Sequence, residues 1–428
     1  MRRWVAPGSR FRAPSALRGA LPGLCSMVLA WTGIAGPASA QALPLPDAPP
    51  AWTVSAVLGA EARAFVDDPL SANQPRRGAI SLVARPELQG WVGSSAWSVA
   101  AVARWDASDP SRRYLDVREA QVQGSWNGIA LLAGMSTVFW GVTESRHVVD
   151  VVNQIDWRAR IDGDEKLGQW MIRGSVDLGS RGFVDLFLLT GARAQRYPGP
   201  GGRPGVPFPV DHEAATYESR WGRWHPDVAA RWSAYAGPFE WAVSAFVGTG
   251  REPQYFLAGP PEAPVLVPRY DLIRQAGLEV QWTAEAWLWK AEGIVRGGQG
   301  STYAAFTGGF ERILFGVGGG RMDVALLGEY SHDGRDDRTL TWFDDDVFAG
   351  ARVVLNDRGG SEIVAGFLAD LGSDGHYAVA EAGTRLGERL RLETAVRLYD
   401  GSAESDPLSW FRADDHFEVT AEYRFRTP

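Results

Sequence analysis

The chain has 428 residues, of which 45% are hydrophobic and 22% are charged, with 50 glycines, 19 tryptophans and one cysteine. This composition excludes an intrinsically disordered chain, which is poor in apolar residues, and a small domain held together by disulfides. The formal net charge is −8, and an acidic balance of this kind argues against a nucleic-acid-binding protein.

The first 40 residues have the pattern of a secretory signal peptide. Five arginines precede an apolar run at 21–34, and the small residues at 38–40 suit a signal peptidase. We expect cleavage before Gln41, which would remove Cys25 and change the net charge from −8 to −13. Residues 41–51 are rich in proline and are expected to form a short periplasmic leader. The mature chain would then have no thiol for disulfides or catalysis.

From residue 52 onward the hydrophobic pattern has a period of two. Between residues 52 and 63 the even-numbered positions are all apolar, whereas Glu61 and Arg63 occupy odd-numbered positions. Such alternation is typical of strands with one apolar and one polar face. Most of the segments with this pattern are about 9 to 13 residues long, the length needed to cross a bilayer at the usual tilt. We count 18 such segments: residues 52–63, 80–91, 97–106, 115–126, 129–139, 170–178, 183–192, 227–236, 239–248, 272–282, 287–296, 303–315, 322–331, 347–355, 362–370, 377–386, 391–399 and 417–425.

The connections between these segments alternate in length. Tight turns rich in glycine, asparagine and proline fall at residues 93–96, 127–128, 179–182, 237–238, 357–360 and 387–388. Longer polar loops fall at residues 67–77, 194–225, 250–269, 332–345 and 400–415. This asymmetry is typical of outer-membrane barrels, and an even strand count places both termini in the periplasm.

We therefore predict an all-β fold, a transmembrane antiparallel up-and-down barrel of about 18 strands over residues 52–425, followed by a short tail at 426–428. Short turns would face the periplasm and long loops the extracellular side. The wall must close because an open sheet edge cannot sit in hydrocarbon. The expected surroundings are the lipid and lipopolysaccharide of a Gram-negative outer membrane, reached through the periplasm.

Aromatic residues gather near the predicted strand ends, as in the girdles that barrels place at membrane interfaces. They are Trp91, Trp97, Trp105, Tyr114, Trp126, Trp140, Trp157, Trp170, Trp221, Trp224, Tyr330 and Trp342. The alternative is a soluble β-core, but one core rarely buries 18 alternating strands. The last segment resembles the C-terminal strand read by the barrel-assembly machinery, an expected partner. Such strands usually stop at their aromatic residue, whereas three residues follow Phe425.

Positions opposite the apolar ones would face the lumen, and they carry charges of both signs. They include Arg104, Glu119, Arg173, Glu279, Lys290, Glu292, Arg296, Glu311, Glu329, Arg385 and Arg397. Eighteen strands enclose an aqueous channel in which such charges stay hydrated and select solutes. Neither sign dominates, so no sharp selectivity is predicted from the wall alone. The alternative is that these residues pair into ladders that stiffen the barrel.

The connection at residues 140–168 is longer than a hairpin needs, which points to function or disorder. Its valines require a surface to pack against, which argues against disorder. We therefore predict a loop folded into the lumen as a constriction, the alternative being an outward cap over the mouth. The residues expected to line the solute path are Trp140, Glu144, Arg146, His147, Asp150, Asn153, Asp156, Arg158 and Arg160.

This loop also holds residue types used in hydrolytic triads and metal sites. Ser145, His147 and Asp150 lie within six positions, too close for the usual triad, and no nucleophile elbow surrounds Ser145. His147, Asp150 and Asp156 have no specific metal-ligand spacing. We therefore predict no catalytic residue, no metal site and no cofactor. Three acidic loops are expected to be solvated rather than to hold Ca²⁺ or Mg²⁺ between lipopolysaccharides, at residues 162–165, 333–337 and 344–346.

Several motifs resemble those of a known group of proteins. The run from Asp116 to Val122 looks like a strand of the 18-stranded porins of the alginate-export type. The run from Phe139 to His147, followed by Val149 to Gln154, resembles a poorly characterised group of proteobacterial porin-like outer-membrane proteins. Further similar motifs are found at residues 250–253, 287–292, 309–311 and 355–357. The resemblance implies an outer-membrane barrel with a transport-like role, and it supplies no substrate.

The function expected from the sequence is passive passage of small or extended polar solutes through a channel constricted by residues 140–168. Two alternatives remain. One is a non-conducting outer-membrane component of a lipid or polymer export system, and the other is a barrel-embedded lipid hydrolase. An anionic polymer such as alginate would favour a path dominated by arginine, which the acidic chain does not suggest.

Overall fold

The computed structural model describes residues 52–160, 163–335, 341, 344–401 and 407–426. The expected signal peptide, the proline-rich leader at 41–51 and the final two residues lie outside this part of the chain.

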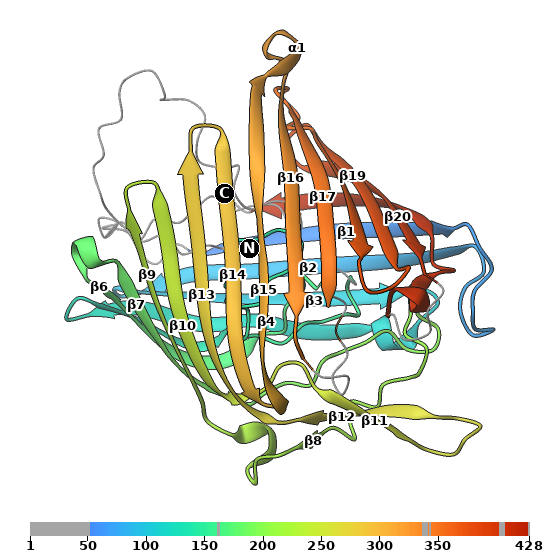
Figure 1. Cartoon of the computed structure of the whole chain (residues 1–428), viewed down its shortest axis with the longest axis horizontal. Coiled ribbons are helices and arrows are strands. Elements are labelled where there is room, and N and C mark those ends of the chain that lie inside the picture. The colour runs from blue at the N-terminus through green and yellow to red at the C-terminus, as the bar shows by residue number, and fades with distance from the viewer. Residues whose placement is uncertain (1–51, 161–162, 336–340, 342–343, 402–406, 427–428) are drawn as a thin grey trace.

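Eighteen strands pair with their neighbours in chain order, always antiparallel, and the first strand pairs with the last (Figure 1). The predicted closed barrel is confirmed. Its wall strands are β1 (Thr53–Phe65), β2 (Gly78–Val92), β3 (Ser95–Asp106), β4 (Tyr114–Trp126), β5 (Ile129–Ser136), β6 (Gln169–Asp177), β7 (Phe183–Thr190), β9 (Asp227–Ala236), β10 (Phe239–Thr249), β13 (Leu272–Ala284), β14 (Trp287–Gly298), β15 (Gly300–Gly316), β16 (Met322–Asp333), β17 (Asp345–Leu355), β18 (Glu362–Asp370), β19 (His376–Leu386), β20 (Leu390–Asp400) and β21 (His416–Arg426).

Outside the wall, a small three-stranded sheet lies among the long loops. It consists of β8 (Thr216–Tyr217), β11 (Gln254–Ala258) and β12 (Val265–Tyr270). The helical segments are short: η1 (Pro110–Arg112), η2 (Gly179–Arg181), η3 (Gly222–Trp224), α1 (Val317–Gly320) and η4 (Pro407–Phe411). Within the described residues, no helix is long and apolar enough to cross a membrane.

The turns at one rim are as tight as their sequences predict. Asn127 and Gly128 both have positive φ, 49° and 79°, as a two-residue hairpin turn with the twist of its strands requires. The same rim holds both described ends of the chain, since Ser55 of β1 lies opposite Arg426 of β21. β21 therefore extends one residue beyond the predicted Phe425.

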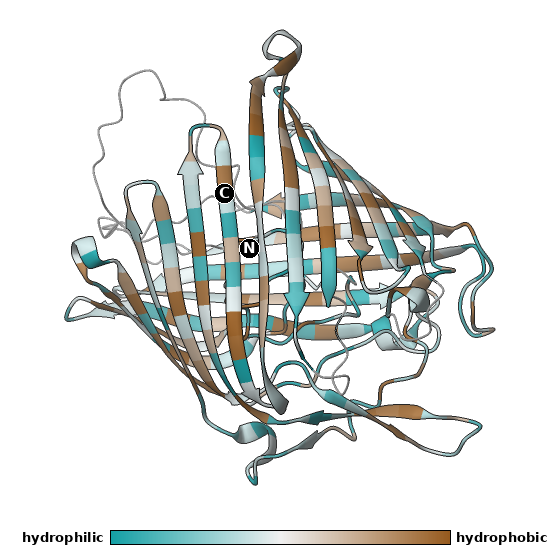
Figure 2. Cartoon of the chain, viewed as in Figure 1, coloured by the Kyte–Doolittle hydropathy of each residue, from teal (hydrophilic) through white to brown (hydrophobic). Residues whose placement is uncertain are grey.

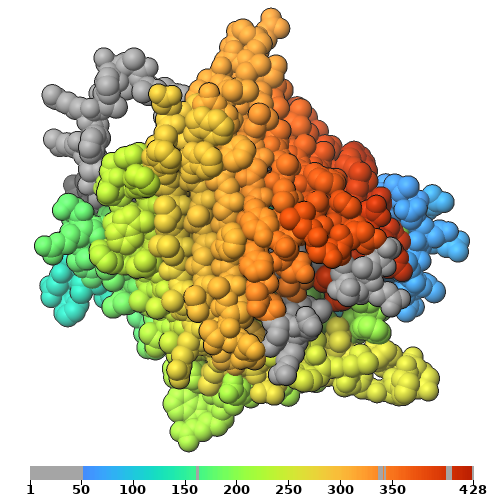
Figure 3. Space-filling view, in the orientation of Figure 1, coloured from blue at the N-terminus to red at the C-terminus, as the bar shows by residue number. Residues whose placement is uncertain are grey.

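The outward face of the wall is apolar, as lipid contact requires. Leu82, Leu186 and Phe306, for example, point outward and are exposed. Figure 2 shows hydrophobic residues recurring along the strands, and Figure 3 shows β13 to β20 as an unbroken outer surface. Exposed tryptophans near strand ends include Trp91, Trp105, Trp126 and Trp170.

Two tryptophans assigned to the girdles lie elsewhere. Trp140 and Trp157 belong to the connection between β5 and β6, which is inside the barrel, and Trp140 is 3% exposed. Trp157 stacks on Tyr197 with ring centroids 6.3 Å apart. Their proximity in sequence to strand ends was therefore misleading, because they pack against protein rather than lipid. Trp342 lies outside the described residues.

A β-bulge in β4 changes which side chains face the lumen. Ala100 of β3 lies opposite Glu119, whereas Ala101 lies opposite Val117, so Arg118 is the extra residue. Because Val117 is exposed on the lipid side, the bulge directs both Arg118 and the half-buried Glu119 inward. Strict alternation would have placed either Arg118 or Glu119 in lipid.

The hydrophobic core lies inside the barrel. Inward residues of the wall form one apolar cluster with valines of the connection between β5 and β6. We assumed that apolar residues of the wall face lipid. This is wrong for some apolar residues of β5, β6, β7, β10, β13 and β14, which face the interior. Their buried inward residues are Leu132, Met171, Phe187, Leu189, Phe246, Ile273 and Ile294.

Candidate functional site

The connection between β5 and β6, residues 137–168, is folded into the barrel, and we call it the inward loop. It begins three residues earlier than predicted, because β5 ends at Ser136 rather than at 139. Asn153 ties its two ends together. The Asn153 Oδ1 accepts the N–H of Val138 at 2.7 Å, and its Nδ2 donates to the carbonyls of Ser136 and Leu167, both at 2.9 Å.

The apolar part of the inward loop packs on one side of the barrel. Val148, Val149, Val151 and Val152 are 5% exposed or less and contact the inner apolar cluster. Full burial of one such side chain contributes about 1.5–3 kcal/mol. These contacts fix the loop against the wall over β5 to β15, and they explain why the lumen is apolar there.

Two wall carboxylates hold the start of the inward loop. Glu292 of β14 accepts hydrogen bonds from the N–H groups of Val142, at 2.6 Å, and Thr143, at 2.9 Å. Glu329 of β16 accepts from Ser145, through its N–H and its hydroxyl, both at 2.7 Å. Hydrogen bonds to an ionised acceptor are stronger than neutral ones. The wall thus binds the loop through loop backbone groups as well as side chains.

Gly141 permits this close approach. Its φ is +136°, and a Cβ at this position would lie 2.8 Å from both Glu292 Oε1 and His147 Nδ1. Only glycine combines that conformation with that space.

A buried charge cluster surrounds Glu144. Lys290 forms ion pairs with Glu144 and, at 3.3 Å, with Glu311. Arg352 of β17 approaches Glu144 at 3.7 Å and Glu362 at 3.0 Å. Burial alone would raise the pKa of the Glu144 carboxyl, but attraction to Lys290 and then to Arg352 outweighs it, so the pKa is lowered. Glu144 is therefore an ionised anchor.

A second chain of ion pairs runs toward the rim opposite the short turns. Arg146 of the inward loop pairs with Asp333, which also contacts Arg335 at 2.6 Å. Arg335 contacts Glu252 at 3.2 Å, and Arg296 contacts Glu252 at 2.5 Å. This chain links the inward loop to the loop after β10.

Asp156 holds the far part of the inward loop. It pairs with Arg118 of the bulge at 2.6 Å and with Arg158 at 2.8 Å, while the Arg158 guanidinium lies 3.8 Å from the ring centroid of Tyr114. Burial opposes ionisation, but the hydrogen bonds from Arg158 and the charge of Arg118 lower the pKa of Asp156 to about 2.

Ser145, His147 and Asp150 have three different partners. Ser145 donates to Glu329, His147 Nδ1 lies 3.5 Å from Glu292, and Asp150 pairs with Lys166. Within the part of the chain that is described, no group of three or more His, Cys, Asp or Glu side chains is arranged to hold a metal ion. The acidic loops at 162–165 and 333–337 lie partly outside that part.

Arg160 is the predicted loop residue that faces an open space. Its guanidinium lies 3.0 Å from Glu381, which also pairs with Arg397 of β20. Between Arg160 and the wall is a small space, about 230 Å³ when the solvent at its opening is included, which we call the gap. Glu393, Thr394, Glu418 and Thr420 also line it. The other charged loop residues predicted for the constriction are buried or half-buried in ion pairs with their neighbours.

The predicted lumen residues occupy three environments. Lys290, Glu292, Arg296, Glu311 and Glu329 lie under the inward loop and are buried. A second group pairs along the wall, as in Arg104 with Glu61 at 2.6 Å, Arg231 with Glu279 at 2.7 Å, Arg397 with Glu381 and, more loosely, Arg173 with Asp185 at 3.9 Å. Glu119 accepts from Thr137, and Arg385 is exposed at the rim of short turns.

Some residues of the site were not identified from the sequence. Arg352 lies on the inward face of β17, so the period of two could have found it. Arg118 and Glu119 are adjacent and both inward because of the bulge, which a strict period of two does not allow. Glu252 and Arg335 lie in loops, where no pattern indicates an inward position.

Solvent reaches the lumen from the rim of short turns. Inward positions near that rim, such as Gln89 and Ser125, are exposed, whereas most inward positions nearer the opposite rim are buried. The barrel is thus open at one end and largely filled by loops toward the other.

The segment between β7 and β9, residues 191–226, lies across the loop-rich rim, and we call it the cap segment. Its Arg203 side chain is fully buried and donates to Asp414 Oδ1 at 2.8 Å and to the carbonyls of Arg76 at 2.8 Å and Asp67 at 2.9 Å. The guanidinium also lies 4.2 Å from the Phe65 ring centroid. One arginine therefore joins loops from opposite sides of the mouth.

Several solved structures share this barrel architecture. OccK3 (OpdO) of Pseudomonas aeruginosa matches with a TM-score of 0.51 and 10% identity, over 88% of this chain and 95% of that chain. OccAB4 of Acinetobacter baumannii matches with a TM-score of 0.51 and 10% identity, over 88% and 98%. The fold is that of the outer-membrane porins. No protein-family model and no curated protein sequence matches the chain.

A third similar structure is Wzi of Escherichia coli, an outer-membrane protein involved in group 1 capsule assembly and described as a carbohydrate-binding β-barrel. It matches with a TM-score of 0.50 and 11% identity, over 86% of this chain and 84% of that chain. At these identities the similarity establishes the shared barrel fold.

Proposed function

We propose that this chain is a porin-like outer-membrane channel for the passive passage of polar solutes, narrowed by the inward loop. The observation that carries the proposal is the docking of the inward loop on buried wall charges, which leaves the gap beside Arg160. A loop serving only as packing would not need to leave charged side chains around a space inside the barrel. The finer relationship to alginate-export-type porins is part of this proposal.

The proposed path runs from the open rim along the wall of β20, β21 and β1 to the gap. Charged side chains at a narrow point act on a solute more strongly than they would in bulk water. Arg160 comes from the inward loop and Glu393 from the wall, so the gap presents both signs of charge across its width. This arrangement suits a small polar solute better than an apolar one.

The proposed location is the outer membrane of a Gram-negative bacterium, reached by export and insertion through the barrel-assembly machinery. The apolar outward face of the wall supports this location, with lipid and lipopolysaccharide as its surroundings. The charged inward loop argues for a transport role rather than an enzyme, since its Ser145 and His147 are engaged with different wall carboxylates.

A cysteine test takes advantage of the absence of cysteine after Cys25. We expect single-channel conductance of Arg160→Cys in planar bilayers to fall by at least half when a charged methanethiosulfonate reagent is added. Asn73→Cys, on an exposed loop, is the matched control and should label without changing conductance. A protein that labels at residue 160 with full conductance would place the path elsewhere, and a protein that never conducts would refute the channel.

The alternative is a non-conducting barrel that binds carbohydrate during envelope polymer export. The cap segment favours it, because Arg203 joins loops across the mouth. Similarity to Wzi is consistent with this alternative at the level of fold. Purified protein that binds capsular polysaccharide on a glycan array and gives no conductance would support it, whereas conductance without glycan binding supports the channel.

A further inference from the structure

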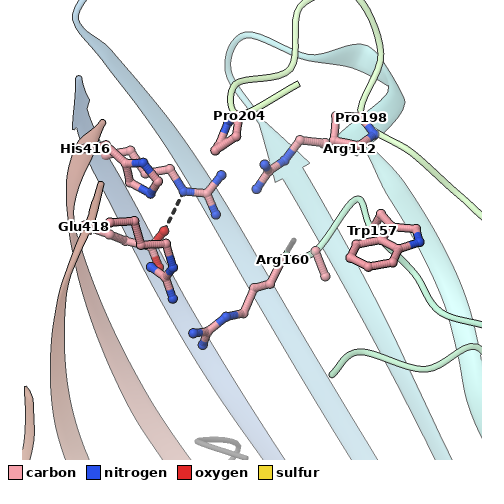
Figure 4. A pocket seen from close by; sticks show the side chains of 10 residues that line it. Arg112, Trp157, Arg160, Pro198, Pro204, His416 and Glu418 are labelled. Atoms are coloured by element: carbon pink, nitrogen blue, oxygen red, sulfur yellow. Dashed lines mark hydrogen bonds and ion pairs between the residues drawn. The ribbon is translucent and has the colours of Figure 1, made fainter. Parts of the chain in front are cut away.

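A pocket lined by arginines lies next to the gap, between the inward loop, η1, the cap segment and the wall (Figure 4). It is a small space, about 310 Å³ when the solvent at its opening is included. We call it the arginine pocket. It shares Arg160 and Glu418 with the gap, so the two spaces are neighbours.

Positive charge is in excess around the arginine pocket. Among the described residues, the ion pairs here join Arg104 to Glu61, Arg63 to Glu418, Arg112 to Asp106, and both Arg160 and Arg397 to Glu381. The charged side chains that line the pocket itself are four arginines, Arg63, Arg112, Arg160 and Arg397, and one carboxylate, Glu418.

Arg112 is buried in this network with part of its guanidinium not hydrogen-bonded. Its side chain is 3% exposed, and its Nη2 makes no hydrogen bond, lying 3.9 Å from the nearest carboxylate, Glu61. Burial, then repulsion from Arg63 and Arg104, lowers the pKa of the Arg112 guanidinium to about 10. A buried donor without an acceptor is unfavourable, so this atom marks where an anionic oxygen would bind.

Apart from His416, the remaining lining of the arginine pocket is apolar. Trp157 of the inward loop and Pro198 and Pro204 of the cap segment form one side. In Figure 4 the guanidinium groups of Arg112 and Arg160 point toward the strand that carries Glu418. A solute held here would meet charge on one side and flat apolar groups on the other, which suits an organic anion.

We infer that the arginine pocket binds the oxyanion group, a carboxylate or a phosphate, of a small organic anion. The inference rests on the proposed channel and names the class of solute that it would take. Arg112 and Arg160 contact the oxyanion, and the body of the solute lies against Trp157. Because η1, the inward loop and the cap segment each contribute side chains, a bound anion also draws these three together.

Titration calorimetry of the detergent-solubilised full-length mature protein tests this binding without any need for conductance. The probes are glucuronate, glucose 6-phosphate and glucose, which share a sugar ring and differ in charge. We expect one or both acids to bind and glucose not to bind. Arg112→Gln should weaken binding at least ten-fold, and Arg113→Gln, an adjacent exposed arginine, should change it less than two-fold.

Binding by one acid alone identifies the group as carboxylate or as phosphate. Equal binding of glucose, binding of neither acid, or unchanged affinity in folded Arg112→Gln would overturn the inference. Heat-modifiable migration on gels verifies that each variant is folded. If Arg112→Gln does not fold, Arg112→Lys retains the charge but loses the planar fork, and a loss of affinity under three-fold would then count against the pocket.

Bilayer recordings on the same samples separate the two proposals. Binding without conductance would support the arginine pocket and refute the channel. Conductance without binding would support the channel and refute the pocket. Raising the ionic strength should weaken binding of the acids, since salt screens charge.

Discussion

At the scale of single residues, Asp156 shows how the inward loop is fixed. Its carboxylate is fully buried and paired with two arginines, one from the bulge in β4 and one from the loop itself. The arginine pocket lies just beyond, lined by Trp157 and Arg160. A change in the protonation of Asp156 would therefore be felt at the proposed solute path.

The pKa of Asp156, lowered from 3.8 to about 2, predicts an acid-sensitive anchor. A carboxyl with a lowered pKa stabilises the docked loop above pH 3.8 and loses that contribution as the pH falls toward 2. The full contribution is about 2 kcal/mol. We expect wild-type conductance to be steady from pH 7 to about 4 and to become noisy below it. Asp156→Asn should be noisy throughout; a quiet variant at pH 7 would contradict the anchoring role.

At the scale of elements, the inward loop both completes the hydrophobic core inside the barrel and narrows the lumen. Its valines cover apolar wall residues, while its backbone N–H groups donate hydrogen bonds to Glu292 and Glu329. Removing the loop would expose buried carboxylates to water inside the lumen. The barrel wall itself would remain paired, because β5 and β6 are hydrogen-bonded neighbours from the Ile129–Val176 pair to the Ser136–Gln169 pair.

We predict that replacing Val142–Asp164 by a short glycine–serine turn raises conductance at least two-fold. The lumen would widen, and the uncovered carboxylates would shift selectivity toward cations. Planar-bilayer recordings with reversal potentials measure both effects. Shortening the β11–β12 hairpin at residues 259–264, which lies outside the wall, is the control. Equal or lower conductance without the inward loop would contradict its role as the constriction.

The strand pattern made the wall predictable, whereas the interior was not. Alternation, turn residues and strand length are local properties, and all 18 strands follow from them. The end of β5 was misplaced because Val138 is apolar, yet its N–H binds Asn153 instead of a neighbouring strand. The partners of the inward loop lie far away in sequence, as with Val142 and Glu292, which are 150 positions apart.

The same distinction applies to the candidate site. Residue type and loop length indicated the inward loop and many of its charged residues. They could not show which of those side chains face the gap, because that depends on pairing with the wall. Arg203 illustrates the limit: it lies in a long polar loop, and only the fold reveals that it is fully buried.

At the scale of the whole molecule, the cap segment makes the two ends of the barrel unequal. Loops converge on Arg203 at one rim, while the other rim is formed by tight turns. Solute entry from the extracellular side would depend on this junction. Access from the periplasmic side would not.

We predict that Arg203→Gln loosens the cap segment and speeds labelling of Arg160→Cys about ten-fold on intact cells. The substitution leaves Asp414 buried without its cation and several loop carbonyls without a donor. Labelling rates with an impermeant thiol reagent provide the measurement. Arg220→Gln, an exposed arginine of the same segment, should leave the rate unchanged. Equal rates in both variants would show that the cap segment does not limit access.

The pairing of β1 with β21 has a consequence for the order of assembly. The wall partners of the inward loop on β14, β16 and β17 lie far from it along the chain, so the loop cannot complete its contacts until those strands have joined the sheet. The seam between the first and last strands closes only once β21 is in place. Docking of the inward loop and sealing of the wall are therefore both late events. We expect a barrel that has not yet closed to lack the contacts of its interior as well.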